Sequence, residues 1–191
     1  KLGGILFQFP SYVVFKDRSL EYLEWAREQV GGDEMLVEFR HRWWLDDENR
    51  AETLAFLEQI GAAYVTVDAP RSDSAKNLIP TVPAVTNGTA YVRFHGRNLG
   101  TWNKRGGSAA ERFDYLYSDD ELAEWTGTLR ELAGESKQAY AFFNNNGSSA
   151  DPENPLGRVS QAATNAQQLR RLLDANNIKA TGGTGASVST A

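Results

Sequence analysis

Short apolar segments alternate with segments of helical periodicity along almost the whole chain. Residues 20–30 and 122–132, for example, carry apolar side chains at intervals of three or four, which is typical of an amphipathic helix. Five apolar segments have the length of strands, and they lie at residues 5–9, 35–39, 62–67, 90–94 and 138–143. This alternation predicts a parallel sheet with helices on its outside.

Local signals agree with these boundaries. Pro10 ends the first apolar segment, and Asp17 or Ser19 can cap the helix that follows it. Gly31 is expected to stop that helix. The run from Ser118 to Glu121 has the form of a capping box. The remaining helices are expected to start at Asp46 or Asp47 and at about Ser160, and to end near residues 60 and 174.

Two closures of such a sheet are compatible with the pattern. One is an open, doubly wound sheet, and the other is part of a barrel of eight strands. Five strands cannot close a barrel of eight by themselves. The chain also enters a strand almost directly after Lys1, so we expect it to be a fragment of a longer protein.

Polar side chains stand at the carboxyl end of every expected strand. In parallel sheets this end is where binding and catalytic sites form, and contributions from all five strands to one rim favour the barrel. Glu38 and Arg40 are two residues apart and so share one side of their strand, as do Arg93 and His95. The polar strand ends are Gln8, Glu38, Arg40, His41, Asp68, Arg93, His95, Asn144 and Asn145.

The segment 97–117 combines cations with aromatic residues. Such a mixture can bind a phosphate and stack on a base or sugar. Arg97, Trp102 and Tyr115 are therefore candidate ligand contacts, whereas Phe113 and Tyr117 are expected to pack against the rim.

Composition excludes several kinds of site. The chain has no cysteine and only two histidines, which excludes thiol chemistry and disfavours a multi-histidine zinc cluster. Its net charge of −5 lacks the basic excess typical of proteins that bind long DNA. No phosphate-binding glycine loop precedes a helix, so no nucleotide cofactor is predicted, and the cofactor stays unknown. A divalent cation held by Glu38, Asp68 and water is a further alternative.

Neither a membrane span nor a signal peptide is visible. No apolar run approaches the roughly 18 residues of a spanning helix. Residues 1–10 read as a strand and lack the basic and long apolar regions of a signal peptide. We therefore expect a cytoplasmic protein without a membrane partner.

Six strings, taken in order, resemble the YecE-like family, domain-of-unknown-function family seventy-two. They are GGILFQFP, VEFRHRWW, YVTVDAP, AYVRFHGRN, ERFDYLYSDDELAEW and AFFNNN followed by ATNAQQLRRLL, and they span about residues 2–176. The resemblance implies a TIM barrel, distantly like those of xylose isomerase and endonuclease IV. Residues 1–178 would be its last five βα units, and residues 179–191 a flexible tail. The family's last strand commonly ends in Asn-Asn-His, but here the third position is Asn146.

The resemblance brings no established reaction, so three hypotheses remain. In the first, the protein is a hydrolase-like enzyme acting on an anionic, phosphorylated or nucleic-acid-derived substrate. Glu38 or Asp68 would be the general base, and His41 or His95 the acid. The substrate would be held by Arg40, Arg93, Trp44, Arg97, Asn98, Trp102, Tyr115, Asn144 and Asn145.

The second hypothesis is a protein that binds an anionic metabolite or single-stranded nucleic acid without turnover. The third is a purely structural ion-pair network at the strand ends. The oligomeric state is not predicted by the sequence.

Overall fold

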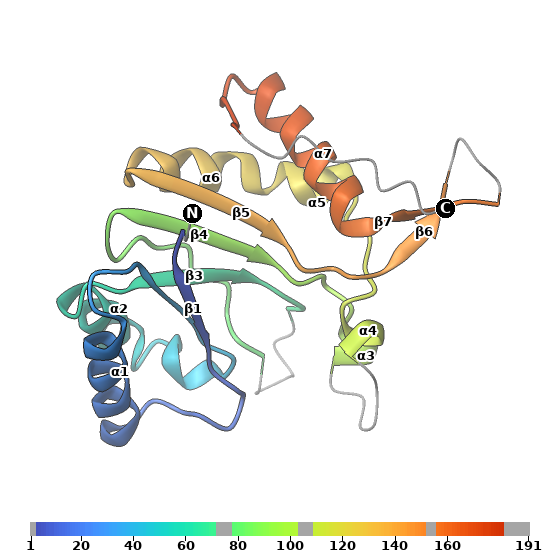
Figure 1. Ribbon diagram of the computed structural model, residues 1–191. Coiled ribbons are helices and arrows are strands. Elements are labelled where there is room, and N and C mark those ends of the chain that lie inside the picture. The colour runs from blue at the N-terminus through green and yellow to red at the C-terminus, as the bar shows by residue number, and fades with distance from the viewer. Residues whose placement is uncertain (1–2, 72–77, 103–108, 152–155, 182–191) are drawn as a thin grey trace.

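The centre of the computed structural model is a five-stranded parallel sheet whose strands follow one another in chain order (Figure 1). The structure describes residues 3–71, 78–102, 109–151 and 156–181. Every neighbouring pair in the sheet is parallel. The strands are β1 Ile5–Gln8, β2 Met35–Glu38, β3 Ala63–Asp68, β4 Thr89–Phe94 and β5 Gln138–Phe143.

Helices connect the strands, as the alternation predicts. Figure 1 shows α1 and α2 beside the half of the sheet that holds β1 to β3, and α6 and α7 beside β5. A short antiparallel pair, β6 Ser148–Ala150 with β7 Arg158–Ser160, precedes the last helix. The helices are α1 Asp17–Val30, η1 Arg42–Trp44, α2 Arg50–Gln59, α3 Leu99–Trp102, α4 Ala109–Arg112, α5 Asp119–Ala123, α6 Trp125–Gly134 and α7 Gln161–Ala175.

The predicted strands are confirmed, with boundaries that differ by one residue at most. The capping box is also confirmed, because the Ser118 side chain accepts from the Glu121 amide while the Glu121 carboxylate accepts from the Ser118 amide. The helix expected over residues 118–132 is interrupted at Glu124 and becomes α5 and α6. The first helix ends at Gly31, whose φ of 63° suits glycine.

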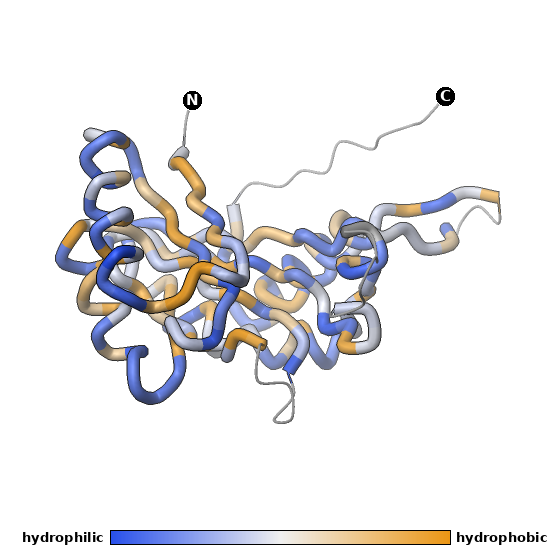
Figure 2. Tube along the Cα trace, turned by 90° about the horizontal axis from the view of Figure 1, so that it is seen from below, coloured by the Kyte–Doolittle hydropathy of each residue, from blue (hydrophilic) through white to orange (hydrophobic). Residues whose placement is uncertain are grey.

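Two hydrophobic clusters hold the helices against one face of the sheet. Met35 and Val37 of β2 pack with Leu23 of α1 and Leu57 of α2 in the first cluster. The second cluster joins alternate residues of β4 to α5, α6 and α7, and contains Ala90, Val92, Phe94, Leu122, Trp125, Leu129 and Leu169. Short hydrophobic stretches alternate with hydrophilic ones along the trace (Figure 2). The strands β2 and β3 are buried along their whole length, whereas β5 is largely exposed.

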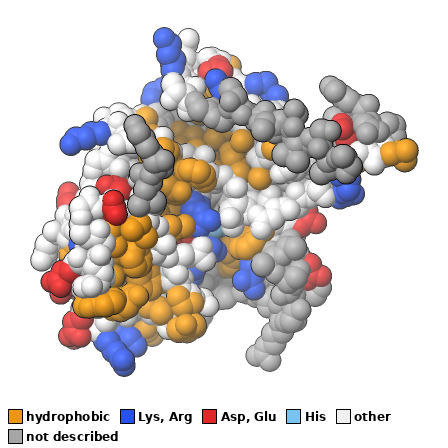
Figure 3. Space-filling model, viewed as in Figure 1, with side chains coloured by type: hydrophobic (Ala, Val, Ile, Leu, Met, Phe, Trp, Pro, Cys, Tyr) orange, Lys and Arg blue, Asp and Glu red, His pale blue; other side chains and the backbone are white. Residues whose placement is uncertain are grey.

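The sheet is not closed into a barrel, and its opposite face is exposed along the edge strands β1 and β5, whereas β2 and β3 are buried on both faces. Within the described ranges β1 and β5 are its two edges. Tyr91 stacks on Phe142, with ring centroids 4.9 Å apart, and Phe142 remains 47% exposed. Figure 3 shows hydrophobic side chains gathered over the face turned to the viewer, with basic side chains near its middle.

No helix in the described part of the chain is both long and apolar enough to cross a membrane.

Candidate functional site

The carboxylate of Glu38, the last residue of β2, is the centre of a polar cluster at the strand ends. Glu38 has no exposed surface. Its Oε1 lies 2.7 Å from Arg40 Nε and 3.1 Å from His95 Nε2, and Arg93 donates to its Oε2. The structure therefore brings together four residues predicted from the strand ends.

Arg93 extends this cluster to both edges of the sheet. Its Nη1 donates to Gln8 Oε1 of β1 at 2.9 Å, and its Nη2 donates to Asn144 Oδ1 beyond β5 at 3.1 Å. The carboxyl ends of parallel strands lie at the same end of the sheet, so residues far apart in the chain can meet there. The strand-end cluster thus consists of Gln8, Glu38, Arg40, Arg93, His95 and Asn144.

The hydrogen bonds of the strand-end cluster determine which nitrogen of His95 carries the proton. A guanidinium can only donate, so the Asn144 atom facing Arg93 must be its oxygen. The amide nitrogen of Asn144 then faces His95 Nδ1 at 3.1 Å and donates to it. Nδ1 is therefore an acceptor, and Nε2 holds the proton that His95 donates to Glu38.

Electrostatics support a neutral His95 beside an ionised Glu38. Burial lowers the pKa of His95 and outweighs its hydrogen bond to Glu38, which acts in the opposite sense. Burial raises the pKa of Glu38, but the hydrogen bond from His95 and the charges of Arg40 and Arg93 prevail and hold it at about 2. One carboxylate thus faces two guanidinium groups, and the cluster carries an excess of positive charge.

Asp68, the second predicted general base, lies on the other face of the sheet. The register pairs Val67 with Arg93 and Asp68 with Phe94, so Asp68 shares the face that packs against the helices. Its carboxylate lies 3.0 Å from Arg97 Nε and 3.0 Å from Arg71 Nη2. The structure therefore places Glu38 and Asp68 in separate clusters and does not bring them together as one site or as one shared cation site.

Arg97 links Asp68 to Glu121 of α5 and to Glu124, which lies between α5 and α6. The Nη2 of Arg97 lies 3.1 Å from Glu124 Oε2, and its Nη1 lies 3.7 Å from Glu121 Oε1. Burial opposes the charged form of Arg97, yet Asp68 and Glu124 raise its pKa. We name Asp68, Arg71, Arg97, Glu121 and Glu124 the Asp68 cluster, and Arg97 therefore binds protein carboxylates in it.

Two further predicted site residues lie elsewhere. Trp44 has no exposed surface, stacks on Phe39 at 4.0 Å and donates through Nε1 to the Val13 carbonyl. It is a core residue, and the structure leaves no Trp44 surface for the contact with substrate that the sequence predicts. His41 caps η1, where its Nδ1 accepts from the Trp43 amide, and this contact does not involve the strand-end cluster.

Trp102 and Phe113 flank the strand-end cluster. The ring of Phe113 lies 5.5 Å from that of His95 and 5.8 Å from that of Trp102. The guanidinium carbon of Arg40 lies 6.0 Å from the Phe113 centroid. Trp102 and Phe113 thus both lie beside the strand-end cluster, although the sequence predicted only packing for Phe113.

Asn98, Tyr115 and Asn145 brace the segment that carries Phe113. Asn98 donates to the Asp114 carbonyl, and the Tyr115 hydroxyl donates to Glu121. Asn145 donates to the Tyr115 carbonyl and to Asn165 Oδ1. These three predicted substrate contacts are engaged with the protein itself, and they position the segment.

Gly96 allows this segment to approach the end of β4. Its φ is 87°, and a Cβ placed there would lie 2.6 Å from the Cβ of Tyr115. Its amide donates to the Tyr117 hydroxyl at 2.8 Å. Only glycine combines this backbone conformation with the close approach.

Sequence reasoning missed Asn165 of α7 and Arg112 of α4. Asn165 is completely buried and accepts from the Tyr117 amide. A signal for it existed, because the buried residues 161, 165, 169 and 173 recur every four positions along α7. The charge of Arg112 acts on Arg40, but no spacing in the sequence relates these two residues.

The described residues contain no group of three or more His, Cys, Asp or Glu side chains placed to hold a metal ion.

The fold and the strand-end cluster define a class of α/β protein, in which a parallel sheet presents a buried, arginine-paired carboxylate at its strand ends. Within that class the chain belongs to the DUF72 family, described as a protein of unknown function, whose model matches residues 1–184. The resemblance to domain-of-unknown-function family seventy-two is thereby confirmed.

Similar proteins agree with this assignment. The chain is 33% identical over 178 residues to UPF0759 protein YunF of Bacillus subtilis (strain 168), covering 91% of this chain and 58% of YunF. The crystal structure of the DUF72 family protein TM1631 from Thermotoga maritima matches with a TM-score of 0.71 at 39% identity, over 88% of this chain and 56% of that one. A crystal structure of EF0366 from Enterococcus faecalis gives 0.76 at 26% identity, over 90% and 58%. The chain thus spans less than two thirds of the length of each of these proteins.

Because of Glu38, the folded protein should be less stable at acidic pH than at neutral pH. Its folded-state pKa of about 2 lies below the ordinary 4.5, so its contribution is complete above 4.5 and is lost as the pH falls toward 2. At about 1.4 kcal/mol per pKa unit, the loss is about 3 kcal/mol. Urea unfolding of the full-length protein at a series of pH values should show that Glu38→Gln lowers stability at pH 7 but flattens its fall in this window. The matched control is Glu24→Gln on the exposed side of α1, and an equally steep fall in both variants would contradict the assignment.

Asn144→Asp should raise the pKa of His95. The substitution replaces the donor that faces Nδ1 by a carboxylate oxygen, which favours a proton on that nitrogen. Nitrogen-15 NMR of the imidazoles at pH 6 should show more doubly protonated His95 than in the parent protein. His41 serves as internal reference because its contact is with the Trp43 amide. An unchanged His95 titration would mean that Asn144 does not determine the tautomer.

Proposed function

We propose that the strand-end cluster binds a small anionic molecule. The observation that carries this proposal is the excess of two guanidinium groups over one carboxylate at Glu38. The side chains of Arg40 and Arg93 are 14% and 13% exposed, so each is partly accessible to a ligand. Guanidinium groups suit carboxylate and phosphate because they donate two parallel hydrogen bonds.

The surroundings of Arg40 support the same conclusion. Arg112 adds a further positive charge that acts on Arg40. Trp102 and Phe113 provide an aromatic wall on which the uncharged part of a ligand can rest. Because the cations are gathered at one point, the site suits a single anionic group better than a nucleic-acid backbone, which requires cations along a track.

Binding is better supported than the hydrolase-like reaction. A general base should titrate near neutral pH, whereas the pKa of Glu38 is held at about 2. A general acid must give its proton to the substrate, whereas both ring nitrogens of His95 are engaged by Glu38 and Asn144. We therefore propose capture of the anion as the function of the cluster.

We also propose that the five-stranded sheet forms part of a TIM barrel in the full-length protein, with residues 1–178 as five βα units. Strands in chain order with helices on one face are what a barrel requires. The chain covers 56% to 61% of the length of the DUF72 structures it matches. In a closed barrel the strand-end cluster would lie at the mouth, which is where such folds bind ligands.

Expression of residues 1–191 alone tests the barrel. Two unpaired edges and the exposed aromatic rings of β5 should make this chain aggregate or melt without cooperativity, because unpaired edges invite association. Size-exclusion chromatography and circular dichroism melting would measure this. A monomer with a cooperative transition would favour an independent open sheet.

Binding of the anion can be tested with inorganic phosphate, citrate and a panel of phosphorylated sugars. Calorimetric titration of the full-length protein should detect binding of one class of these ligands. Arg40→Gln should weaken the binding of that ligand by about tenfold or more, because a hydrogen bond to a charged group is worth about 1.5–3 kcal/mol. Arg40→Lys keeps the charge and should lose less. Arg50→Gln is the matched control, because Arg50 pairs with Asp47 at the surface of α2. Equal affinity in the parent protein and both Arg40 variants, measured at a temperature at which all three are folded, would exclude the cluster as the site.

A further inference from the structure

The two terminal nitrogens of Arg40 are donors of the strand-end cluster that the protein itself leaves unused. Both terminal nitrogens of Arg93 are already engaged by side chains of the cluster. Of the Arg40 nitrogens only Nε, which faces Glu38, is enclosed, and within the described ranges the terminal nitrogens form no hydrogen bond. Because the Arg40 side chain is 14% exposed, a ligand can reach its terminal end.

Arg112 lies beside this end of Arg40. It is the last residue of α4 and directly precedes Phe113. The Phe113 centroid lies 6.0 Å from the guanidinium carbon of Arg40 and 5.5 Å from the His95 ring. The Arg112 side chain is half-buried, and only its Nε is enclosed. Arg112 can therefore present its own terminal nitrogens to the same ligand.

No carboxylate balances the charge of Arg112 in the part of the chain that the structure describes. Its acidic neighbours in the chain are Glu111 and Asp114, and neither forms an ion pair with it. Asp114 instead accepts a hydrogen bond from Gln161 Nε2 at 2.8 Å. The positive charge of Arg112 thus adds to the charge of the strand-end cluster.

The resulting charge matches a dianion better than a monoanion. Burial lowers the pKa of Arg40, Glu38 raises it, and the like charges of Arg93 and Arg112 lower it further. Burial also lowers the pKa of His95, which is neutral. Three guanidinium groups therefore face the single carboxylate of Glu38, which leaves an excess of two positive charges. A ligand with one negative charge would leave part of the repulsion between the guanidinium groups in place.

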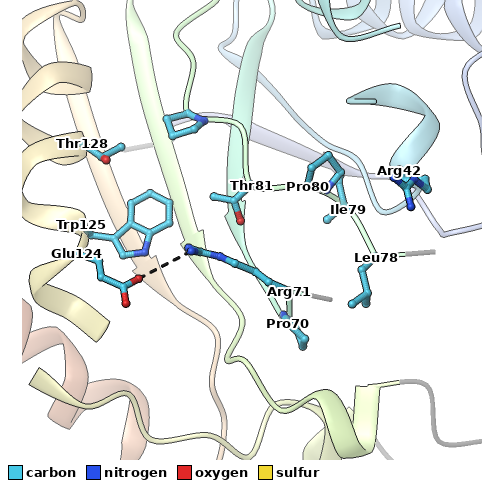
Figure 4. Close-up of a pocket in the computed structure, with 11 residues that line it drawn as sticks. Arg42, Pro70, Arg71, Leu78, Ile79, Pro80, Thr81, Glu124, Trp125 and Thr128 are labelled. Carbon is cyan, nitrogen blue, oxygen red and sulfur yellow. Dashed lines mark ion pairs between the residues drawn. The ribbon is translucent and has the colours of Figure 1, made fainter. Parts of the chain in front are cut away.

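The cavity of about 590 Å³ between residues 78–83 and the start of α6 suits a dianion less well (Figure 4). Its charged lining residues are Arg42, Arg71 and Glu124. Arg71 lies 3.0 Å from Asp68 and 3.8 Å from Glu124, and Figure 4 marks the second of these pairs by a dashed line. Among the described residues Arg42 is then the lining cation without a carboxylate partner, and one cation matches a monoanion.

We propose that the ligand of the strand-end cluster is the dianion of a phosphomonoester, with its phosphate between the terminal nitrogens of Arg40 and Arg112 and its body beside Phe113 and Trp102. A phosphomonoester carries a charge of about −1.5 to −2 at pH 7 and three strong acceptor oxygens, which suit two forked donors. Because the cations are gathered at one point, two charges on a single group fit better than a dicarboxylate. Arg112 is then the residue that selects a dianion. This inference rests on the proposed anion function and assigns its ligand class.

The test compares phenyl phosphate with phenyl sulfate, which has a similar shape but a single charge at every pH used. Calorimetric titration of the full-length protein at pH 7.5 should show that phenyl phosphate binds about fivefold more tightly or better, since it makes the additional charged contact. The second pKa of a phosphomonoester is about 6, so its affinity should fall by about five- to tenfold between pH 7.5 and pH 5. The affinity for phenyl sulfate should not fall, because protonation of His95 or His41 would add positive charge and act in the opposite sense.

Three variants complete the test. Arg112→Gln removes the additional contact, so its affinity for phenyl phosphate should fall by about fivefold or more and approach its affinity for phenyl sulfate. Arg112→Lys keeps the charge and should retain most of the preference. Arg171→Gln changes an exposed residue of α7 and should leave both affinities unchanged. The pH series on the parent protein tests the inference even if Arg112→Gln does not fold.

The inference is overturned by equal affinity for the two esters, by the same pH dependence for both, or by an Arg112→Gln variant that keeps the preference. If Arg40→Gln still weakens binding in these cases, the proposed anion function survives. If neither ester binds, or if Arg40→Gln binds both as tightly as the parent protein does, the anion function fails and the inference fails with it.

Discussion

Burial of the Glu38 carboxylate is the constraint on which the end of the sheet depends. An ionised carboxylate without access to water must be paired and hydrogen-bonded, and Arg40, Arg93 and His95 do this together. Loss of one partner from a buried pair costs about 3–5 kcal/mol, because the other charge stays buried. Since Arg93 also contacts Gln8 and Asn144, the same charge ties four strand ends to one another.

The pairing also decides what the strand-end cluster can do chemically. The contacts that make Glu38 stable in its ionised form remove its basicity near neutral pH. Asn144 holds His95 in the tautomer that donates to Glu38, so the imidazole is occupied on both sides. The groups that remain available to a ligand are the positively charged guanidinium groups, beside the aromatic rings of Trp102 and Phe113. Affinity for an anion follows from this arrangement more directly than proton transfer does.

Buried amide side chains hold in place the segment that carries Phe113. Asn145 and Asn165 hydrogen-bond to each other and to the backbone of residues 115 and 117. Gly96 lets the same segment come within contact of the end of β4. On the helix-covered face, Arg97 donates to Asp68 and forms an ion pair with Glu124. Asp68 and Glu38 therefore belong to two charge networks that the sheet separates.

The sequence by itself determined the features that depend on neighbours in the chain. Apolar periodicity located the five strands of the parallel sheet, the Ser118 hydroxyl and the Glu121 carboxylate marked a helix start, and alternation placed Glu38 with Arg40 on one face. Tertiary structure alone decided which strand ends meet. The register opposite β4 turned Asp68 toward the helices, and stacking on Phe39 drew Trp44 into the core. The reason is physical: strand and helix patterns arise from adjacent residues, whereas register, burial and hydrogen-bond direction depend on side chains brought from distant parts of the chain.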